Sequence, residues 1–245
     1  MPLPPSPSRL LARLGHRLVQ QFRLVDIPVT LPWSGTTLRV LQPATFDRLL
    51  TAAARDPEQN LPYWATIWPS GIALGDALLH RPSPNGGRPV LELGGGLGVT
   101  ATAALAAGVD LLVTDYSPVT LLLNRANALR NTGRQPRTLQ LNWRQPPPAL
   151  FARAPYHLVL AADVLYEARD VEPLLALVER LVAPDGALWL AEPSRPPAQR
   201  FVAAAQANGW HDQLTHHQGP WPDPGDEGVV VNLHLLHRSA ARAAI

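Results

Sequence analysis

The sequence contains neither cysteine nor lysine, and each absence excludes a class of site. Without cysteine the chain can form no disulfide bond and can offer no thiolate to a metal ion. All 21 basic residues are arginines, so the lysine that the phosphate-binding loop of nucleoside triphosphatases requires is missing as well. Disulfide scaffolds, thiolate metal centres and P-loop enzymes are therefore excluded.

Long apolar runs and a strong charge imbalance are also missing. No apolar stretch reaches about 18 residues free of charge, so we expect a cytoplasmic protein with no membrane-spanning helix and no membrane partner. The 21 arginines are spread along the chain and face 19 acidic residues, which leaves a formal net charge of +2. Because duplex binding usually requires a clustered basic stripe, a nucleic-acid partner is the less favoured interpretation.

We expect one α/β domain over residues 61–245, preceded by a small cap over residues 1–60. The cap begins with apolar residues at helical spacing, which predict a helix packed on the domain. The buried face of this helix would consist of Leu10, Leu14, Leu18 and Phe22. Because the stretch carries arginines and no acid before Asp26, a transit peptide is the alternative interpretation. Two β-branched or alternating stretches joined by "WSG" then predict a hairpin over residues 22–43, and a short helix follows over 45–54.

Beyond residue 60, apolar strands alternate with helical segments, a pattern typical of a mostly parallel sheet covered on both faces. Helices are predicted at residues 69–80, 97–107, 117–131, 171–182 and 195–208. Strands are predicted at residues 88–93, 110–114, 137–141, 156–162, 187–191, 211–217 and 228–236. No helix separates the last two strands, so they should form an antiparallel hairpin at the sheet edge. The predicted fold is a doubly wound, Rossmann-like sheet of seven mostly parallel strands.

The segment "LELGGGLG", residues 91–98, places four glycines directly after the first strand of this sheet. At such a strand-to-helix turn, backbone N–H groups and the positive end of the helix dipole face a ligand, and glycine lets the ligand approach closely. The dinucleotide fingerprint requires glycine or alanine where this chain has Val99, so that match is incomplete. The alternative is a tight turn that serves strand–helix packing alone.

The spacing Glu-x-Gly-x-Gly-x-Gly over Glu92, Gly94, Gly96 and Gly98 resembles motif I of S-adenosylmethionine-dependent methyltransferases. Asp115 ends the next strand, where a carboxylate can accept hydrogen bonds from both hydroxyls of a ribose. This acid fits a dinucleotide as well as S-adenosylmethionine, so the glycine spacing decides between them.

Three further stretches resemble one group of the class I, seven-β-strand methyltransferases. The segment "LPYWATIWPSGIALGDAL" is similar to the entry segment of the protein lysine methyltransferases. Asp163 and Tyr166 match the Asp-x-x-Tyr/Phe motif of that family. The segment "EPSRP" resembles bacterial relatives of the electron-transfer-flavoprotein β-subunit lysine methyltransferases, often named predicted nicotinamide N-methyltransferases. The resemblance spans about residues 60 to 210 and implies S-adenosylmethionine as the cofactor.

The resemblance also implies roles for individual residues. Glycine amides would face the methionine carboxylate of the cofactor, Glu92 would attract its ammonium group, and Asp115 would bind its ribose. Tyr116 and Trp143 would offer aromatic faces to adenine, and Trp68 would stabilise the sulfonium cation. The cofactor-binding set is Trp68, Glu92, Gly94, Gly96, Asp115, Tyr116, Trp143 and Ala162. Asp163 and Tyr166 would be the catalytic pair, and no metal is required.

Several of these residues have a purely structural alternative. The aromatic side chains could belong to the core, and Tyr63 and Trp64 could tie the cap to the sheet. The chain has Asn142 before Trp143 where the family commonly has aspartate, so recognition of adenine through an acid is in question. Asp163 could cap the next helix instead of binding an acceptor. A buried carboxylate at a strand end is costly unless it is paired, which favours a functional role for Asp163.

The favoured function is methyl transfer from S-adenosylmethionine to the nitrogen of a protein lysine, with Asp163 orienting the amine and Tyr166 bordering its channel. Two alternatives stay open: a small-molecule amine or heteroaromatic acceptor, and a binding module that keeps the cofactor but transfers nothing. A DNA base is disfavoured because "ADVLYE" lacks the prolines of the Asn/Asp-Pro-Pro-Tyr motif. We expect a monomer. A metal site is not expected either, because the C-terminal histidines, interpreted as surface residues, are unsuitably spaced. They are His211, His216, His217, His234 and His237.

Overall fold

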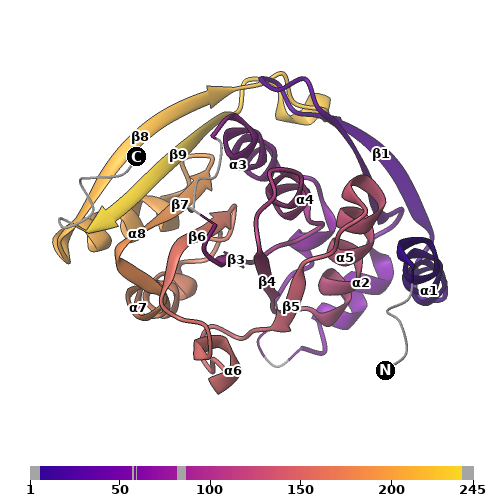
Figure 1. Ribbon diagram of the computed structural model, residues 1–245, viewed down its shortest axis with the longest axis horizontal. Helices are drawn as coiled ribbons and strands as arrows, with labels where there is room; N and C mark the ends of the chain where they lie inside the picture. Colours follow the sequence, from indigo (N-terminus) through magenta and orange to yellow (C-terminus); the bar gives the residue numbers. More distant parts are fainter. Residues whose placement is uncertain (1–5, 57, 59, 82–86, 239–245) are drawn as a thin grey trace.

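The computed structural model describes residues 6–56, 58, 60–81 and 87–238, in which seven strands form a central sheet (Figure 1). Their order is β5-β4-β3-β6-β7-β9-β8; the first five are parallel, and β9 pairs antiparallel with both β7 and β8. The predicted mostly parallel sheet with an antiparallel C-terminal hairpin is therefore confirmed. The strands are β3 (Val90–Leu93), β4 (Leu111–Asp115), β5 (Arg137–Gln140), β6 (Tyr156–Ala162), β7 (Val182–Glu192), β8 (Trp210–Gln218) and β9 (Val230–Arg238).

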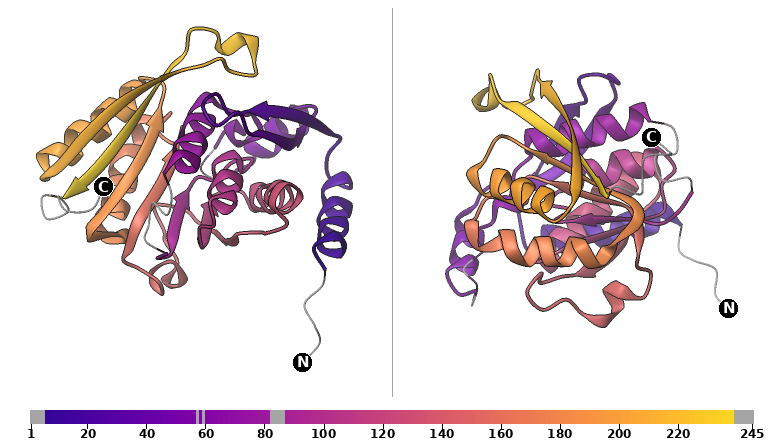
Figure 2. Two further views of the ribbon diagram at one scale, coloured as in Figure 1. Left: turned by 45° about the horizontal axis from the view of Figure 1, so that its top comes forward. Right: turned by 90° about the vertical axis from the view of Figure 1, so that its left-hand side faces the viewer.

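Helices cover both faces of the sheet. On one face lie α3, α4 and α5, and on the other α7 and α8, as the two views of Figure 2 show. Three of these helices begin with proline, whose missing N–H is tolerated in the first helical turn. The bounds are α3 (Pro69–His80), α4 (Val99–Ala106), α5 (Pro118–Thr132), α6 (Pro148–Phe151), α7 (Val171–Leu181) and α8 (Pro196–Ala207), with short 3-10 turns η1 (Tyr63–Ala65), η2 (Ala168–Asp170) and η3 (Pro224–Asp226).

Strands β3 and β4 lie side by side in the interior of the sheet. Every residue of β3 and β4 is buried, as expected for parallel strands with helices on both faces. Polar side chains enter these strands toward their carboxyl ends, at Glu92 and Asp115. Because parallel strands end at one edge of the sheet, the two carboxylates are brought to the same side of the molecule.

The N-terminal elements wrap around α5 (Figure 1). Helix α1 (Pro7–Val19) packs beside α5 through the predicted apolar face, in which Leu14 and Leu18 are buried and Leu10 and Phe22 are partly buried. The predicted hairpin consists of β1 (Leu24–Thr30) and β2 (Thr37–Pro43), and the short helix α2 (Asp47–Ala53) follows it. The hairpin tip lies beside the β8–β9 hairpin, where the Trp33 ring is 4.0 Å from that of His217.

The C-terminal strands differ from expectation in two respects. Strand β7 begins at Val182, before the predicted start at residue 187. The interpretation of the histidines as surface residues is wrong for His217, His234 and His237, which are buried. The reason is that β9 lies between β7 and β8, and Trp33 contacts His217. Within the described ranges no helix is long and apolar enough to cross a membrane.

Candidate functional site

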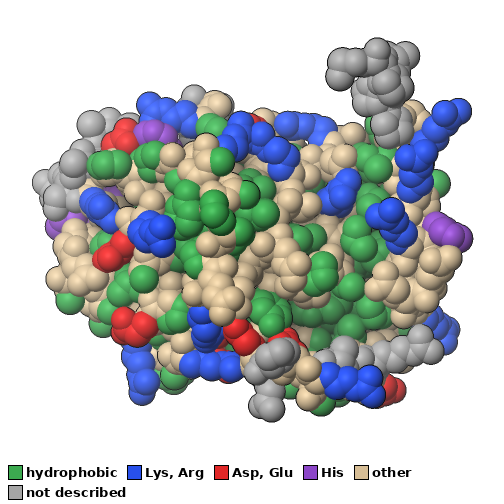
Figure 3. Space-filling view, turned by 90° about the horizontal axis from the view of Figure 1, so that it is seen from below, with side chains coloured by type: hydrophobic (Ala, Val, Ile, Leu, Met, Phe, Trp, Pro, Cys, Tyr) green, Lys and Arg blue, Asp and Glu red, His purple; other side chains and the backbone are tan. Residues whose placement is uncertain are grey.

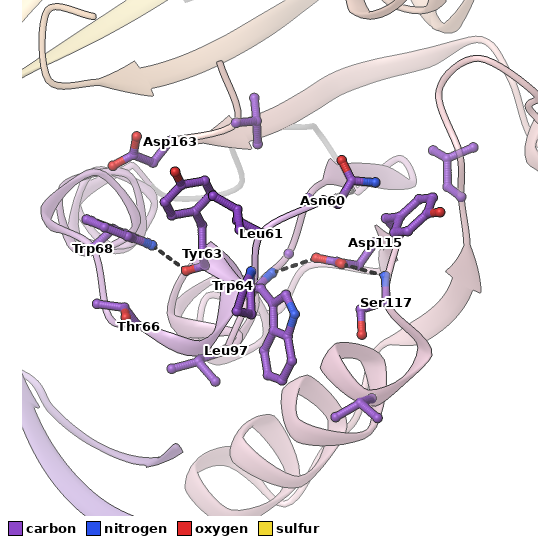
Figure 4. Close-up of a pocket in the computed structure, with 18 of the residues that line it drawn as sticks. Asn60, Leu61, Tyr63, Trp64, Thr66, Trp68, Leu97, Asp115, Ser117 and Asp163 are labelled. Atoms are coloured by element: carbon purple, nitrogen blue, oxygen red, sulfur yellow. Dashed lines mark hydrogen bonds between the residues drawn. The ribbon is translucent and has the colours of Figure 1, made fainter. Parts of the chain in front are cut away.

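A cavity of about 700 Å³ lies at the carboxyl ends of the parallel strands. Residues of the segment 60–68 contribute to its lining, and Figure 4 shows Tyr63 and Trp64 between Asp163 on one side and Asp115 on the other. The sequence-predicted site residues all contribute to its lining: Trp68, Glu92, Gly94, Gly96, Asp115, Tyr116, Trp143, Ala162, Asp163 and Tyr166. The structure thus brings the whole predicted set together, and the roles of its members stay predictions.

The glycine loop between β3 and α4 depends on glycine for two physical reasons. Gly94 has a φ of 68°, in the left-handed region that other residues rarely adopt. A Cβ atom at Gly94 would also lie 2.7 Å from a methyl group of Val164. The loop therefore brings its backbone close to the segment that follows β6 and leaves the start of α4 open toward the cavity.

Glu92 is a buried acid with an unsatisfied oxygen. The residue is 2 % exposed, and its Oε2 atom has no hydrogen-bond partner among the described residues. Burial, reinforced by the nearby charge of Asp115, raises the pKa of the Glu92 carboxyl well above its ordinary value. A buried acceptor without a partner is costly, so it fits a ligand that brings a cationic amino group into the cavity.

Asp115 is held by backbone amides at the end of β4. Its Oδ2 accepts a hydrogen bond from the Gly96 N–H at 3.1 Å, and its Oδ1 accepts one from the Ser117 N–H at 3.0 Å. Burial raises the pKa of Asp115 to about 6, although these amides oppose the shift. The carboxylate is thus fixed in orientation and still able to accept hydrogen bonds from hydroxyl groups of a ligand.

The aromatic side chains of the lining are held at their polar ends. The Tyr116 hydroxyl donates to Asp56 Oδ1 at 2.7 Å, and Trp68 Nε1 donates to the carbonyl of Tyr63 at 2.7 Å. Burial and the neighbouring Asp56 raise the pKa of Tyr116 to about 12, so its hydroxyl stays protonated. These bonds fix the rings while leaving their faces available to a ligand.

Asp163 follows β6 in an unusual backbone conformation. Its φ is 53°, which a non-glycine residue adopts only when the surrounding structure holds it there. Arg195 Nε donates to Asp163 Oδ1 at 2.9 Å, and the Ser70 hydroxyl donates to Oδ2 at 3.4 Å. Burial raises the pKa of the Asp163 carboxyl, while Arg195 acts in the opposite direction. Helix α7 begins only at Val171 and its cap makes no side-chain hydrogen bond, so Asp163 does not cap it.

Tyr166 lines the cavity in the segment that joins Asp163 to η2. Its ring is tilted against that of Tyr63, with 4.6 Å between the ring centres, and the Tyr63 ring is 6.5 Å from that of Trp68. Burial raises the pKa of the Tyr166 hydroxyl. Three aromatic rings therefore line the cavity that Asp163 also lines, and they would strip water from a side chain that enters.

The segment before η1 is tied to the far side of the cavity by polar contacts. Asn142 donates to Glu58 Oε1 at 2.5 Å, and Arg144 donates to Glu58 Oε2 at 3.0 Å. Arg169 donates to the carbonyl of Glu58 at 2.7 Å. These contacts account for the asparagine at position 142, because an amide can donate to Glu58 where an aspartate would repel it.

Sequence reasoning missed two residues that the structure places next to Asp163. Ser70 lies within the helix predicted at residues 69–80, and Arg195 lies within the "EPSRP" segment, but neither was assigned a role of its own. Their contact with Asp163 joins positions 93 and 32 residues apart, so no local pattern indicates it. Across the described residues, no group of three or more acids or histidines is arranged to hold a metal ion.

Comparison with known proteins matches residues 58–207 to a family described as lysine methyltransferase. Mouse EEF1A lysine methyltransferase 3 is 29 % identical over 184 residues, 73 % of this chain and 75 % of that protein. The electron transfer flavoprotein β-subunit lysine methyltransferase of Danio rerio is 41 % identical over 71 residues, which are 29 % of this chain and 28 % of that protein.

Among solved structures, a precorrin-6y C5,15-methyltransferase from Geobacter metallireducens superposes with a TM-score of 0.51 at 12 % identity. The superposition covers 67 % of this chain and 87 % of that one, and it shows a shared fold. The aligned part of the Danio rerio relative is little more than a quarter of its length, whereas the family match spans most of the present chain.

Proposed function

Because this chain belongs to the lysine methyltransferase family, we propose that it transfers the methyl group of S-adenosylmethionine to a lysine side chain of another protein. The family match confirms the predicted family, and the structural superposition confirms the predicted fold. Membership of the family supports methyl transfer as the activity and S-adenosylmethionine as the cofactor. The observation that carries the lysine acceptor is the position of Asp163. This carboxylate lines the same cavity as the predicted cofactor residues and the paired rings of Tyr63 and Tyr166.

The residues of the cavity fit this cofactor. The orphaned oxygen of Glu92 suits the cationic amino group of the methionine part, and the amides at the start of α4 suit its carboxylate. Asp115 would accept hydrogen bonds from the ribose hydroxyls. Tyr116 and Trp143 would contact adenine, and Trp68 would lie near the sulfonium end.

The bound cofactor supplies an electrophilic methyl group: the amine lone pair forms the new N–C bond while the S–C bond breaks, and its electron pair passes to sulfur. Asp163 would accept a hydrogen bond from the amine and aim its lone pair at the methyl carbon. Tyr63, Trp68 and Tyr166 would enclose the aliphatic part of the lysine. An amine that has gained a methyl group carries a positive charge, and its proton leaves to solvent water at the mouth of the cavity.

Acceptor choice would rest with the surfaces around the cavity. We assign residues 1–60 to a cap that, with the segment after β6 and the β8–β9 turn, selects the partner protein. The relatives support this assignment because they are named for different proteins, an elongation factor in one case and an electron-transfer flavoprotein subunit in the other. We also propose a monomer in the cytoplasm. Arginine side chains are spread over the face seen in Figure 3 and form no single stripe, so nucleic acid is not the proposed partner.

Incubation of the protein with host extract and cofactor tritiated on the methyl group tests the acceptor class. We expect label in acid-precipitated protein, no label without the enzyme, and no label with Asp163→Asn. Label confined to the small-molecule fraction would favour an amine or heteroaromatic metabolite instead. Cofactor binding by calorimetry, without label in either fraction and without S-adenosylhomocysteine formation, would favour a silent binding module.

A further inference from the structure

The turn between β7 and α8, residues 192–196, contains the "EPSRP" segment and is held in place by buried polar contacts. Glu192 is buried and accepts a hydrogen bond from the Arg195 N–H at 2.8 Å and one from Asn232 at 2.7 Å. Asn232 also donates to the Ser194 hydroxyl at 2.9 Å, and Ser194 has a φ of 61°. A strained backbone with this many contacts places the side chain that follows it in a defined direction.

That side chain is Arg195, and it points at Asp163. Its Nε lies 2.9 Å from Asp163 Oδ1, and its guanidinium carbon lies 5.7 Å from the centre of the Trp68 ring. The Asp163 side chain is 4 % exposed, whereas that of Arg195 is 35 % exposed. Arg195 is not part of the cavity lining, so it contacts Asp163 from behind the cavity surface.

Negative charge near Asp163 makes its pairing with Arg195 important for the protonation state of an entering lysine. Glu192 and Asp226 both face Asp163 with negative charge, and Arg195 is the cation paired with it. A carboxylate left without Arg195 would bind an entering lysine as an ammonium and hold it protonated. A protonated amine has no lone pair for the methyl group, so such a pairing would inhibit transfer.

We propose that Arg195 is a positioning residue of the methyl transfer: it holds Asp163 in place and offsets its charge, so that the lysine binds and reacts as a neutral amine. This inference rests on the proposed function. It also assigns a role to the "EPSRP" segment, in which Glu192 and Ser194 orient the turn and Arg195 acts on Asp163. Asp163 would then orient the amine through hydrogen bonding and would not trap it as an ion pair.

The test compares Arg195→Gln, Arg195→Lys and the control Arg200→Gln, which changes an exposed arginine on helix α8 directly after this turn. The probe is the extract protein that takes the methyl label, purified and used at saturating concentration between pH 6.5 and 9.5. For Arg195→Gln we expect the midpoint of the kcat profile to move up by about one pH unit, with kcat at pH 7.5 about tenfold lower and recovery at high pH. Arg195→Lys should restore most of the activity, and Arg200→Gln should behave as the parent protein.

A second measurement needs no acceptor. A carbon-13 NMR titration of the Asp163 carboxyl, assigned by its loss in Asp163→Asn, should show a higher midpoint in Arg195→Gln and no change in Arg200→Gln. The inference would be overturned if the Asp163 titration were unchanged in Arg195→Gln. It would also be overturned if Arg195→Gln lost kcat equally at every pH and Arg195→Lys did not restore it. Failure of the parent protein to label any protein would contradict the proposed function, whereas the NMR titration would still report on the pair.

Discussion

Asp115 and Asp163 both line the cavity, and they differ in the groups that bind their carboxylates. Asp115 accepts hydrogen bonds from the N–H groups of Gly96 and Ser117, which carry no net charge. Asp163 is paired with the guanidinium group of Arg195. A carboxylate held by neutral amides is suited to hydroxyl donors, whereas one already paired with a cation attracts a second cation only weakly. The residues around each carboxylate thus match the ribose and the amine, respectively.

Replacement of Asp163 by asparagine should lower kcat by about 100-fold or more, because the amine loses the acceptor that orients it. The dissociation constant of S-adenosylmethionine should stay within about twofold of the parent value, since we assign Asp163 to the acceptor and not to the cofactor. Calorimetry and single-turnover rates check the two parts. The control is Asp185→Asn, which changes an exposed aspartate. Full turnover in Asp163→Asn would show that Asp163 does not orient the amine.

Cofactor affinity should depend on pH through Asp115. Burial raises the pKa of this acid to about 6, and only the ionised form accepts hydrogen bonds from both ribose hydroxyls. Ionisation is complete well above pH 6 and is lost below it, so binding of S-adenosylmethionine should weaken as the pH falls from 7 to 5. Calorimetry across this range measures the effect. Asp115→Asn should bind weakly at every pH, and an equal slope in that variant would assign the dependence to another group.

Gly94, in the loop between β3 and α4, has a matched control in Gly133, which ends helix α5. Gly94 and Gly133 both have a φ of 68°, but only Gly94 has a neighbour that a Cβ would strike. Gly133→Ala should therefore cost about 1 kcal/mol of unfolding free energy, the ordinary penalty for a left-handed alanine. Gly94→Ala should cost more and should weaken cofactor binding about tenfold or more, because the loop must shift away from Val164. Equal effects of the two changes would refute the crowding explanation.

Two asparagine side chains of helix α5 form hydrogen bonds with the backbone N–H and C=O groups along the edge of β2. A neighbouring strand would satisfy these groups with its own backbone. Asn127 accepts from the Leu41 N–H at 2.8 Å and donates to the Leu41 and Leu97 carbonyls at 3.0 and 2.9 Å. Asn131 bonds the N–H and carbonyl of Arg39 in the same manner. The exposed edge of β2 is thereby satisfied, which protects it from pairing with another chain.

Asn127→Ala should destabilise the protein by about 2 to 4 kcal/mol, because Asn127 is fully buried and the change leaves the polar groups of Leu41 and Leu97 without partners. Asn131→Ala should cost about 1 kcal/mol, since the Arg39 backbone groups that it frees lie at the surface. Urea unfolding of both variants checks the difference. A cost for Asn127→Ala no larger than that for Asn131→Ala would show that α5 does not support the hairpin in this way.

Local patterns predicted the elements well, and contacts between distant elements explain what they missed. The strand-to-helix turn at Gly94 and the carboxylates Glu92 and Asp115 stand in one motif, so their place at the sheet edge follows from the alternation of strands and helices. Arg195 was missed because its partner Asp163 belongs to another strand end. The burial of His234 was missed because it depends on β9 lying between β7 and β8, which spacing along the chain does not indicate.

At the scale of the whole molecule, the three C-terminal strands share a buried charge cluster. His234 lies between Asp212 Oδ2 at 2.7 Å and Glu192 Oε1 at 3.5 Å, which joins β8, β9 and the end of β7. Burial lowers the pKa of His234, but the hydrogen bonds to Asp212 and Glu192 outweigh burial and raise the pKa to about 9 from an ordinary value of 6.5. The cluster therefore stabilises the fold as long as His234 is protonated.

Stability should fall on the alkaline side. Because the pKa of His234 is higher in the folded state than in the unfolded state, its contribution to the unfolding free energy is complete below pH 6.5. This contribution is lost as the pH rises through about 9. The unfolding free energy should decrease by at most about 3 kcal/mol across this window. Urea unfolding at pH 6.5, 7.5 and 9 measures the decrease. His234→Leu should be less stable at pH 6.5 and should show a flatter dependence than the control His16→Gln, which changes an exposed histidine; an unchanged slope would exclude His234 as its source.

Identification of the modified amino acid shows whether this protein methylates lysine in other proteins. Protein labelled in host extract with tritiated S-adenosylmethionine is hydrolysed to amino acids and separated by chromatography beside authentic standards. We expect the tritium to elute with methylated lysine, and we expect Asp163→Asn to leave this fraction empty. Methylation of protein lysine would be contradicted if the tritium eluted with methylated arginine or were recovered only outside the protein fraction.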